Sequence, residues 1–250
     1  MSGALTLSSF GAGLNAAVIG ASGGIGGALA DKLDRCPAVS RVFRLSRNRV
    51  ETAHQDWLPL DLADEASIAD AAATLQREAG SFHVVIVATG ILHDGERLQP
   101  EKTWRALSAP ALETAFRINT VGPALVAKHF LPLLDKDGKS AFAAISARVG
   151  SIEDNRLGGW HAYRASKAAL NMLIQNFAIE LARRNPEAVC VGLHPGTVDT
   201  ALSMPFQSGV PQEKLFPPQR SARHLLSVLD RLTPNESGGL YAWDGSRIPF

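Results

Sequence analysis

Short apolar runs alternate along the chain with segments in which apolar residues recur every three or four positions. The apolar runs predict seven β-strands, over residues 14–20, 42–45, 57–60, 84–88, 141–145, 189–193 and 240–243. The helical period predicts helices over residues 24–35, 65–79, 162–184 and 220–232, and two helices sharing residues 101–134 with a break near Pro110. Because the strand runs are apolar throughout, they are typical of parallel strands covered on both faces. The order predicts an α/β fold, a doubly wound parallel sheet of the Rossmann type with about seven strands.

The pattern contains no repeat, low-complexity tract or interdomain linker, so we expect one domain over residues 1–250. Residues 1–13 are small and polar without a basic start, which predicts a flexible lead-in and not a signal peptide. Residues 199–218 are rich in proline and show little periodicity. We expect a loop over a substrate site there, with an ordinary surface loop as the alternative.

Composition narrows the classes of partner. The net charge of +1 gives no broad field for nucleic acid or an anionic membrane surface, and no apolar run has the length of a membrane span. The chain has two cysteines, Cys36 and Cys190, without metal-ligand spacing. We expect two reduced thiols in a cytoplasmic protein, although the two could pair. No histidine and carboxylate cluster has the spacing of a metal site, so we expect none.

A glycine-rich turn follows the first strand and opens the first helix. It comprises Gly20, Ala21, Ser22, Gly23, Gly24, Ile25 and Gly26. Glycines at such a turn bring backbone N–H groups close to a phosphate, and the helix N-terminus adds its positive end. The turn therefore predicts a dinucleotide site, the alternative being a tight turn of purely structural use.

The end of the second strand bears on which dinucleotide binds. An acidic residue there would bind the ribose hydroxyls of NAD, but this strand continues into Ser46, Arg47, Asn48 and Arg49. Ser46 and Arg47 favour the 2′-phosphate of NADP, because an arginine makes a charge-assisted bond to phosphate. A solvated basic turn is the alternative.

Tyr163 and Lys167 are four residues apart at the start of a predicted helix, so both side chains lie on one face. An ammonium beside a phenol favours the phenolate, which lowers the phenol pKa and makes it a usable proton donor and acceptor. Taken alone, this spacing is common by chance.

Further motifs occur in a fixed order around this pair. They are Ala88-Thr89-Gly90 after the fourth strand, Asn119 in the next helix, and the segment from Pro195 to Thr200. Together with the glycine turn and the Tyr163/Lys167 pair, they resemble the short-chain dehydrogenase/reductase family across nearly the whole chain. The stretches Val149-Gly150-Ser151-Ile152 and Gly158-Gly159-Trp160 resemble the branch containing C-factor-type proteins and sniffer-type carbonyl reductases.

The resemblance implies roles for these residues. Tyr163 would be the general acid or base, Lys167 would bind the nicotinamide ribose, and Asn119 would hold a water behind Lys167. The other implied cofactor contacts are Asp61 and Leu62 at the adenine, Ala88, Thr89 and Gly90 at the adenosine ribose, and Pro195, Gly196, Val198 and Thr200 over the nicotinamide. Structural alternatives stay open for three of them: Asn119 could satisfy helix backbone groups, Asp61 could cap the next helix, and the Pro195-Gly196 turn could be only a strand exit.

The fifth strand departs from the family pattern. The family usually places a serine at its end to hold the substrate oxygen, and that position is Ala147 here. Adjacent strand residues face opposite ways, so Ser146 replaces it only with a local bulge or twist. We take Ser146 as the first candidate for this hydroxyl and Ser151, from the longer segment that follows, as the second. A site without any serine is the third possibility.

These features favour an NADPH-dependent oxidoreductase of aldehydes or ketones. The alternative is a dinucleotide-binding signalling or regulatory protein with weak catalysis, suggested by the C-factor resemblance and Ala147. Apolar residues in the loop suggest an apolar substrate; they are Leu202, Met204, Pro205 and Phe206. Analogy with the family also predicts a homodimer or homotetramer. The sequence identifies neither the substrate nor the cellular direction of the reaction.

Overall fold

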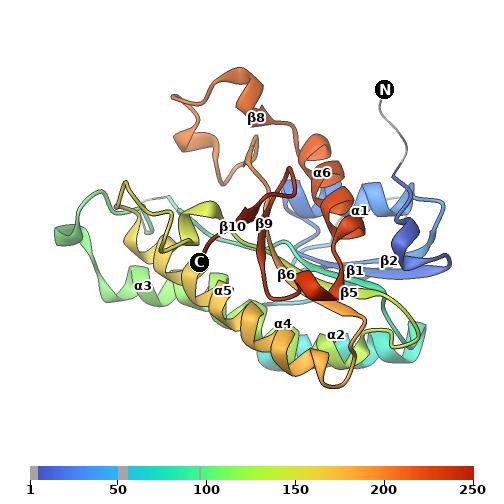
Figure 1. Ribbon diagram of the computed structural model, residues 1–250. Helices are drawn as coiled ribbons and strands as arrows, with labels where there is room; N and C mark the ends of the chain where they lie inside the picture. The colour runs from blue at the N-terminus through green and yellow to red at the C-terminus, as the bar shows by residue number, and fades with distance from the viewer. Residues whose placement is uncertain (1–4, 50–55, 96) are drawn as a thin grey trace.

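The computed structural model describes residues 5–49, 56–95 and 97–250, and its centre is one twisted sheet (Figure 1). The strands are β1 (Leu14–Ile19), β2 (Val39–Ser46), β3 (Trp57–Pro59), β4 (Val84–Val87), β5 (Ser140–Ile145), β6 (Ala188–His194), β9 (Leu240–Ala242) and β10 (Arg247–Ile248). Their order is β10-β9-β6-β5-β4-β1-β2-β3, and only β10 runs antiparallel to its neighbour. The predicted Rossmann-type fold is confirmed, with eight strands in place of about seven.

Helices cover both faces of the sheet, as the uninterrupted apolar strands require. On one face lie α1 (Gly24–Asp34) and α6 (Pro218–Arg231), whose Leu29 and Leu225 pack with Val18 and Ile86 of the sheet. The other face is covered by α2 (Glu65–Ala79), α4 (Gly122–Phe130) and α5 (His161–Ala182). The site described below lies where the carboxyl ends of the strands emerge between these two layers.

The segment before α4 differs from the expected pair of helices. Only a 3₁₀ turn (Trp104–Ala106) precedes Pro110, and α3 (Ala109–Phe116) begins at that proline instead of breaking there. Proline suits the first turn of a helix, where its missing N–H has no intrahelical partner. A π-helical turn, Arg117–Val121, then joins α3 to α4 and places Asn119 against α5.

The beginning of the chain also differs from expectation. Residues 1–4 lie outside the described residues, but residues 5–13, expected to be part of a flexible lead-in, are packed on the body. Leu7 is wholly buried and Phe10 nearly so, in the same core as α6. Ser9 donates from its backbone N–H and its hydroxyl to Asp230 at the end of α6. Two apolar side chains in an otherwise small and polar stretch are enough to fix it, because each buries its surface against the core.

The expected loop over the site is tied at its base by a second, small sheet. In this sheet β7 (Thr197–Val198) pairs in parallel with β8 (Leu215–Phe216). Between them the chain makes 3₁₀ turns at Met204–Phe206 and Gln212–Lys214, and Figure 1 shows this segment standing above the sheet. Strands of two residues carry no periodicity, so the sequence pattern did not indicate them.

Both cysteines are free, buried thiols. Burial raises the pKa of Cys190, in β6, to about 12, so this thiol stays protonated at neutral pH. Among the described residues, no helix has the length and apolar character to cross a membrane, and no group of three or more metal-binding side chains gathers in one place.

Candidate active site

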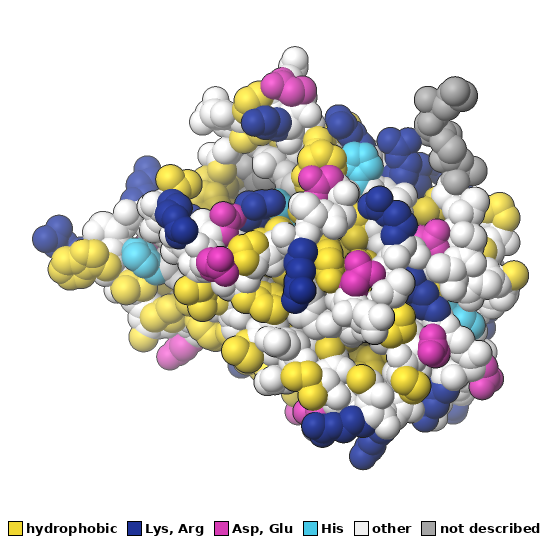
Figure 2. All heavy atoms as spheres, viewed as in Figure 1, with side chains coloured by type: hydrophobic (Ala, Val, Ile, Leu, Met, Phe, Trp, Pro, Cys, Tyr) yellow, Lys and Arg dark blue, Asp and Glu magenta, His cyan; other side chains and the backbone are white. Residues whose placement is uncertain are grey.

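A cavity of about 670 Å³ opens at the carboxyl ends of β1, β4, β5 and β6. Its walls come from the glycine turn, the residues after β4 and β5, the first turns of α5, and the segment from His194 to Val210. Figure 2 shows the loop between β7 and β8 as a lobe at the top of the molecule, with a hollow beneath it. Ligands of open α/β sheets bind in the crevice outside the carboxyl ends of the strands, which is where this cavity lies.

The glycine turn is built so that only glycine fits. Gly20 has a positive φ of 86°, and a Cβ on Gly26 would lie 2.2 Å from the carbonyl oxygen of Gly20. α1 begins after Gly23, and no side chain caps its first turn. Gly23, Gly24 and Ile25 line the cavity. The turn thus leaves the helix N-terminus open toward the cavity, and this arrangement fits the pyrophosphate of a dinucleotide.

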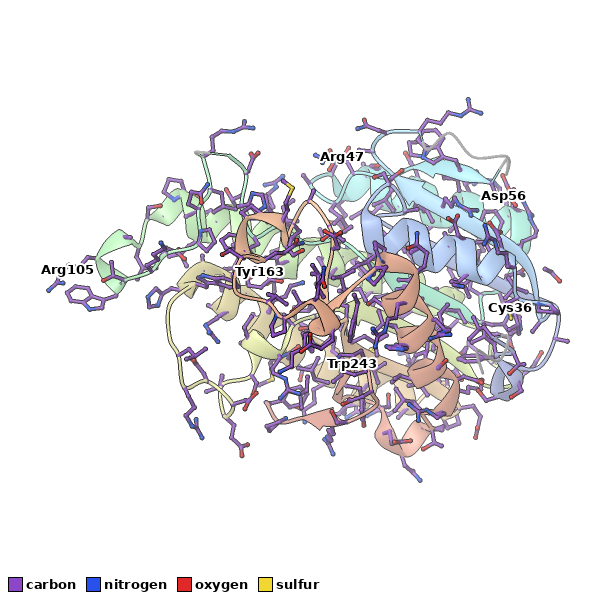
Figure 3. All side chains as sticks on the ribbon, turned by 90° about the horizontal axis from the view of Figure 1, so that it is seen from above. Cys36, Arg47, Asp56, Arg105, Tyr163 and Trp243 are labelled. Atoms are coloured by element: carbon purple, nitrogen blue, oxygen red, sulfur yellow. The ribbon has the colours of Figure 1, made fainter. Side chains whose placement is uncertain are left out.

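The end of β2 lies outside the cavity walls. Ser46 is buried, and its hydroxyl donates to the carbonyl of Asn48 while accepting from the indole of Trp57. Arg47 is exposed, and Figure 3 shows it on the same open side of the molecule as Tyr163, well apart from it. The Ser46 hydroxyl therefore already has two hydrogen-bond partners, and the exposed Arg47 side chain is more accessible to a phosphate.

Asp61 and Leu62 follow β3 and also lie outside the cavity walls. The Asp61 carboxylate accepts from the backbone N–H of Ala63, and Leu62 is buried against Gly122. The cap of α2 is Asp64, which accepts from Ala66. The alternative in which Asp61 caps the helix is therefore wrong.

The residues after β4 are pinned by Asn119. Its amide oxygen accepts from the Ile91 N–H, and its amide nitrogen donates to the Ile91 carbonyl and to Ser166. Asn119 is wholly buried, so these bonds hold the backbone beside Ala88, Thr89 and Gly90, which line the cavity. Its partners are this loop and a side chain of α5, not helix backbone groups as in the structural alternative.

Tyr163 and Lys167 meet at the bottom of the cavity. The Lys167 ammonium donates to the carbonyl oxygen of Ile145 at 2.8 Å and lies 5.9 Å from the centre of the Tyr163 ring. Gly90 stands opposite, and a Cβ there would lie 3.6 Å from the ammonium nitrogen. The spacing that could have been chance thus places a phenol and an ammonium together in the same cavity.

Burial shifts the pKa of each group toward its neutral form. It raises the pKa of Tyr163 to about 12 and lowers that of Lys167 to about 7. The direction for Tyr163 is opposite to the one expected from a neighbouring ammonium, because removal from water disfavours the charged phenolate. Tyr163 therefore carries its proton at neutral pH, as a proton donor must.

Neither candidate serine presents a free hydroxyl to the cavity. Ser146 donates to the Asn171 side chain at 2.7 Å, although the residue contributes to the cavity wall. Ser151 is buried outside the wall, where its hydroxyl accepts from the Asp154 N–H. Ala147 lines the cavity. The alternation of side chains along β5 explains the result, since it turns Ser146 toward α5 and leaves Ala147 at the site.

The segment after β6 forms the remaining wall. Pro195, Gly196, Val198 and Thr200 all line the cavity. Gly196 has a φ of 78°, and a Cβ on it would lie within 3.0 Å of Phe216 and Trp243. The Val198 carbonyl accepts from the Ser203 and Thr200 hydroxyls. The turn is thus packed from behind by aromatic rings, and it forms part of the cavity wall.

Among the wall residues, His93, Trp160 and His194 had no role assigned from the sequence, whereas Phe206 lies in the wall as expected for the loop. Burial lowers the pKa of His194 to about 4, so its imidazole is neutral at neutral pH. The Gly158-Gly159 doublet before Trp160 was a signal of unusual backbone, since both glycines have positive φ. His93 gave no local signal, because only the fold brings its segment to the loop that carries Phe206.

Comparison with known proteins identifies the family of this chain. The short chain dehydrogenase family model matches residues 14–210. The C-signal of Myxococcus xanthus is 37% identical over 136 residues, which cover 54% of this chain and 76% of that protein. Carbonyl reductase Sniffer of Drosophila melanogaster has the same fold, with a TM-score of 0.82 and 23% identity over 95% of this chain and all of that one. An NADPH-bound carbonyl reductase from chicken fatty liver has a TM-score of 0.78 and 26% identity, covering 96% of this chain and all of that one.

The fold, the glycine turn and the family match define the class of protein. The chain belongs to the short-chain dehydrogenase/reductase family. It is an oxidoreductase of that family, whose members work with a nicotinamide dinucleotide and a small-molecule substrate. The expected branch agrees with the chain's likeness to the C-signal and to the NADPH-bound carbonyl reductase.

Proposed function

We propose that this protein reduces the carbonyl group of an aldehyde or ketone with NADPH, and that Tyr163 is the general acid. The observation that carries the proposal is the meeting of Tyr163 and Lys167 in the cavity, opposite the uncapped N-terminus of α1. The likeness to an NADPH-bound carbonyl reductase supports the same reaction.

In this proposal the chain's own residues handle the proton and the cofactor's position. The glycine turn would bind the pyrophosphate, and the dinucleotide, when bound, would supply the hydride. Tyr163 would donate its proton to the carbonyl oxygen, and at neutral pH, which lies below its pKa, the phenol carries that proton. Lys167, held on the Ile145 carbonyl, would bind the nicotinamide ribose and attract the phenolate that forms. Asn119 would act by fixing the loop after β4, and Ser146 by its bond to Asn171.

Measuring NADPH oxidation against a panel of aldehydes and ketones tests the reductase proposal. We expect turnover by the parent protein and loss of turnover in Tyr163→Phe, which keeps the ring and removes the proton. NADPH should still bind to this variant. A parent protein that binds NADPH but reduces no carbonyl, or an active Tyr163→Phe variant, would contradict the proposal.

The preference for NADPH over NADH rests on Arg47, exposed beside the end of β2. Arg47→Ala should raise KM for NADPH and leave KM for NADH nearly unchanged, because only NADPH carries the 2′-phosphate. Arg183→Ala, an exposed arginine just beyond the far end of α5, is the matched control. Equal KM values for NADPH and NADH in the parent protein would rule out the preference.

A dinucleotide-binding signalling protein with weak catalysis is the second candidate. Two observations favour it, the absence of a serine at Ala147 and the 37% identity to the C-signal. Tight NADPH binding without turnover on any carbonyl of the panel would select this function.

We also propose a cytoplasmic homodimer or homotetramer. The buried free thiols suit a reducing compartment. Large apolar side chains stand exposed on the outer helices, namely Val121, Met172 and Ile179. Such side chains suit an interface between copies, and light scattering of the purified protein would measure the assembly.

A further inference from the structure

A row of aromatic rings crosses the cavity beside Tyr163. The Trp160 ring centre lies 6.3 Å from that of Tyr163 and 5.1 Å from that of Phe206, and Phe206 lies 5.7 Å from His93. All four residues line the cavity. They come from three segments: the start of α5, the loop between β7 and β8, and the chain after β4. The wall beside the proposed proton donor is therefore made of π surfaces.

Trp160 is held in a backbone conformation that side chains seldom adopt. Its φ and ψ are 49° and 43°, the left-handed region, and it follows Gly158 and Gly159, which also have positive φ. For a bulky residue this conformation costs about 1–3 kcal/mol and persists only where the surroundings enforce it. Strained residues of this kind cluster at functional sites, so the backbone conformation indicates a functional role for Trp160.

Buried groups enforce this conformation. The Trp160 N–H donates to the Glu101 carbonyl, and the Glu101 carboxylate accepts from the Ala162 N–H at 3.2 Å. Arg164 donates from Nε to the Gly159 carbonyl at 3.0 Å. Glu101 is only 5% exposed, so solvent does not compete with these bonds. The backbone that carries the indole is consequently held in place, and the ring lies against those of Tyr163 and Phe206.

Beside Tyr163, the end of β5 offers no free hydroxyl to orient a substrate, and the polar side chains of the cavity come from other segments, among them Thr89 and His194. Ala147 offers no hydroxyl, and the Ser146 hydroxyl is bonded to Asn171. An aromatic ring, in contrast, gains about 0.5–1.5 kcal/mol from offset or edge contact with another ring, beyond the burial of its surface. A pocket whose wall presents the Trp160 and Phe206 rings next to Tyr163 favours ligands that carry a flat ring.

We infer that Trp160 is a specificity-determining residue that makes the site select carbonyl groups conjugated to an aromatic ring. The ring of the substrate lies against the indole while its carbonyl oxygen reaches the Tyr163 hydroxyl, and Phe206 closes the same wall from the loop. This inference rests on the carbonyl reduction proposed above, and it adds the class of substrate and the residue that selects it.

The kinetic test compares benzaldehyde with cyclohexanecarbaldehyde, which differ in the flat ring but little in size. Trp160→Leu should lower kcat/KM for benzaldehyde about fivefold to tenfold and leave cyclohexanecarbaldehyde nearly unchanged. Trp160→Asn, which tolerates the left-handed backbone, repeats the test in a variant with less strain. Trp104→Leu is the control, because Trp104 is 65% exposed and its neighbour Arg105 lies far from Tyr163 in Figure 3. The ratio of kcat/KM for the two aldehydes is compared between variants, so the difference in their intrinsic reactivity cancels.

A binding test separates this inference from the reductase proposal. Titration calorimetry of benzamide and cyclohexanecarboxamide into the protein saturated with NADP⁺ needs no turnover. We expect benzamide to bind several-fold more tightly, and the difference to vanish in both Trp160 variants but not in Trp104→Leu. If benzamide is preferred and no carbonyl is reduced, the selectivity stands and the reductase function fails. If turnover occurs but neither ratio changes in the Trp160 variants, or benzamide is not preferred, the inference is overturned.

Discussion

The side chain at position 147 sets how many hydrogen bonds can reach an oxygen beside Tyr163. Ala147 lines the cavity, whereas the neighbouring Ser146 faces α5 and bonds Asn171. A donor aimed at the developing oxyanion is worth up to about 3 kcal/mol of barrier height. In the proposed reduction, Tyr163 would thus be the donor to this oxygen, and a serine at position 147 would add a second.

Ala147→Ser should accordingly raise kcat for carbonyl reduction, by about tenfold if half of that energy is realised. Ser146→Ala is the comparison, and we expect it to cost about 1 kcal/mol of stability with little change in kcat. Steady-state kinetics and denaturant unfolding of both variants measure the two effects. If Ser146→Ala lowers kcat by a larger factor than Ala147→Ser raises it, then the Ser146 hydroxyl turns to the substrate.

The buried Lys167 leads us to expect that the stability of the protein depends on pH. Its pKa is 10.5 in the unfolded chain and about 7 when buried in the fold. Between these values the unfolded state binds more protons, so the stability contributed by this group rises as the pH rises. Lys167→Met keeps the length and removes the titration. The variant should lose activity yet melt at a higher temperature than the parent below pH 7. The difference in Tm should shrink as the pH approaches 10.5. A difference that does not depend on pH would contradict this account.

At the scale of elements, α2 and α5 differ in how their N-termini are capped. Asp64 caps α2 locally, by accepting from Ala66. α5 has no local cap, because Trp160 provides none, and its Ala162 N–H is satisfied by Glu101 from a distant segment. The helix that carries Tyr163 thus depends on a tertiary contact for the order of its first turn.

Removing each cap gives a matched pair of variants. Asp64→Ala and Glu101→Ala should each lower the free energy of unfolding by about 1 kcal/mol. Only Glu101→Ala should also lower kcat, because only α5 positions Tyr163, and Glu101→Gln should restore part of it by keeping an acceptor. Chemical denaturation and steady-state kinetics report the two quantities. Similar kcat values for the two alanine variants would show that the distant cap has no role in catalysis.

The elements that the sequence predicted well are those with many residues in one pattern. The buried strand β4 and the helix α5 are long enough for the apolar pattern to define them. The two-residue strands β7, β8 and β10 are not, since a period cannot be recognised in two positions. Pro110 was placed correctly as a boundary but read as a break, because a proline marks either the end of a helix or its first turn.

The features of the candidate site also divide into those that the sequence could predict and those that it could not. The glycine turn and the Tyr163/Lys167 pair were predictable, since each lies within one short segment. The bond that turns Ser146 away from the cavity depends on Asn171, and the wall at Trp160 depends on Phe206 and Glu101. These contacts join residues far apart in the chain, so no local pattern could show them.

At the scale of the whole molecule, residues 5–13 connect the end of α6 to Lys139, just before β5. The Lys139 ammonium donates to Ser9 and to the carbonyls of Leu229 and Asp230, and it lies 4.4 Å from the centre of the Phe10 ring. Burial lowers the pKa of Lys139 to about 8. Residues 5–13 are therefore part of the fold, close to the end of α6 and remote from the cavity.

Leu7→Ala should lower the free energy of unfolding by about 2–5 kcal/mol, because it empties a fully buried position. Leu5→Ala, at a partly buried neighbour, should cost less. The kcat of both variants should stay near that of the parent, since neither residue touches the cavity wall. Urea unfolding midpoints measure the cost, and a Leu7→Ala variant as stable as the parent would mean that this segment contributes nothing to the core.

The pairing of β7 with β8 determines which segment of the chain can be exchanged during evolution. Because Thr197 and Val198 are bonded to Leu215 and Phe216, the chain between them leaves and returns at one place. The entropy of closing a loop grows only slowly with its length, so this segment can be exchanged or extended at little thermodynamic cost. Gly196, held from behind by Phe216 and Trp243, stays where it is. New substrate ranges can thus arise by grafting residues 201–214, while Pro195 to Thr200, expected over the nicotinamide, are kept.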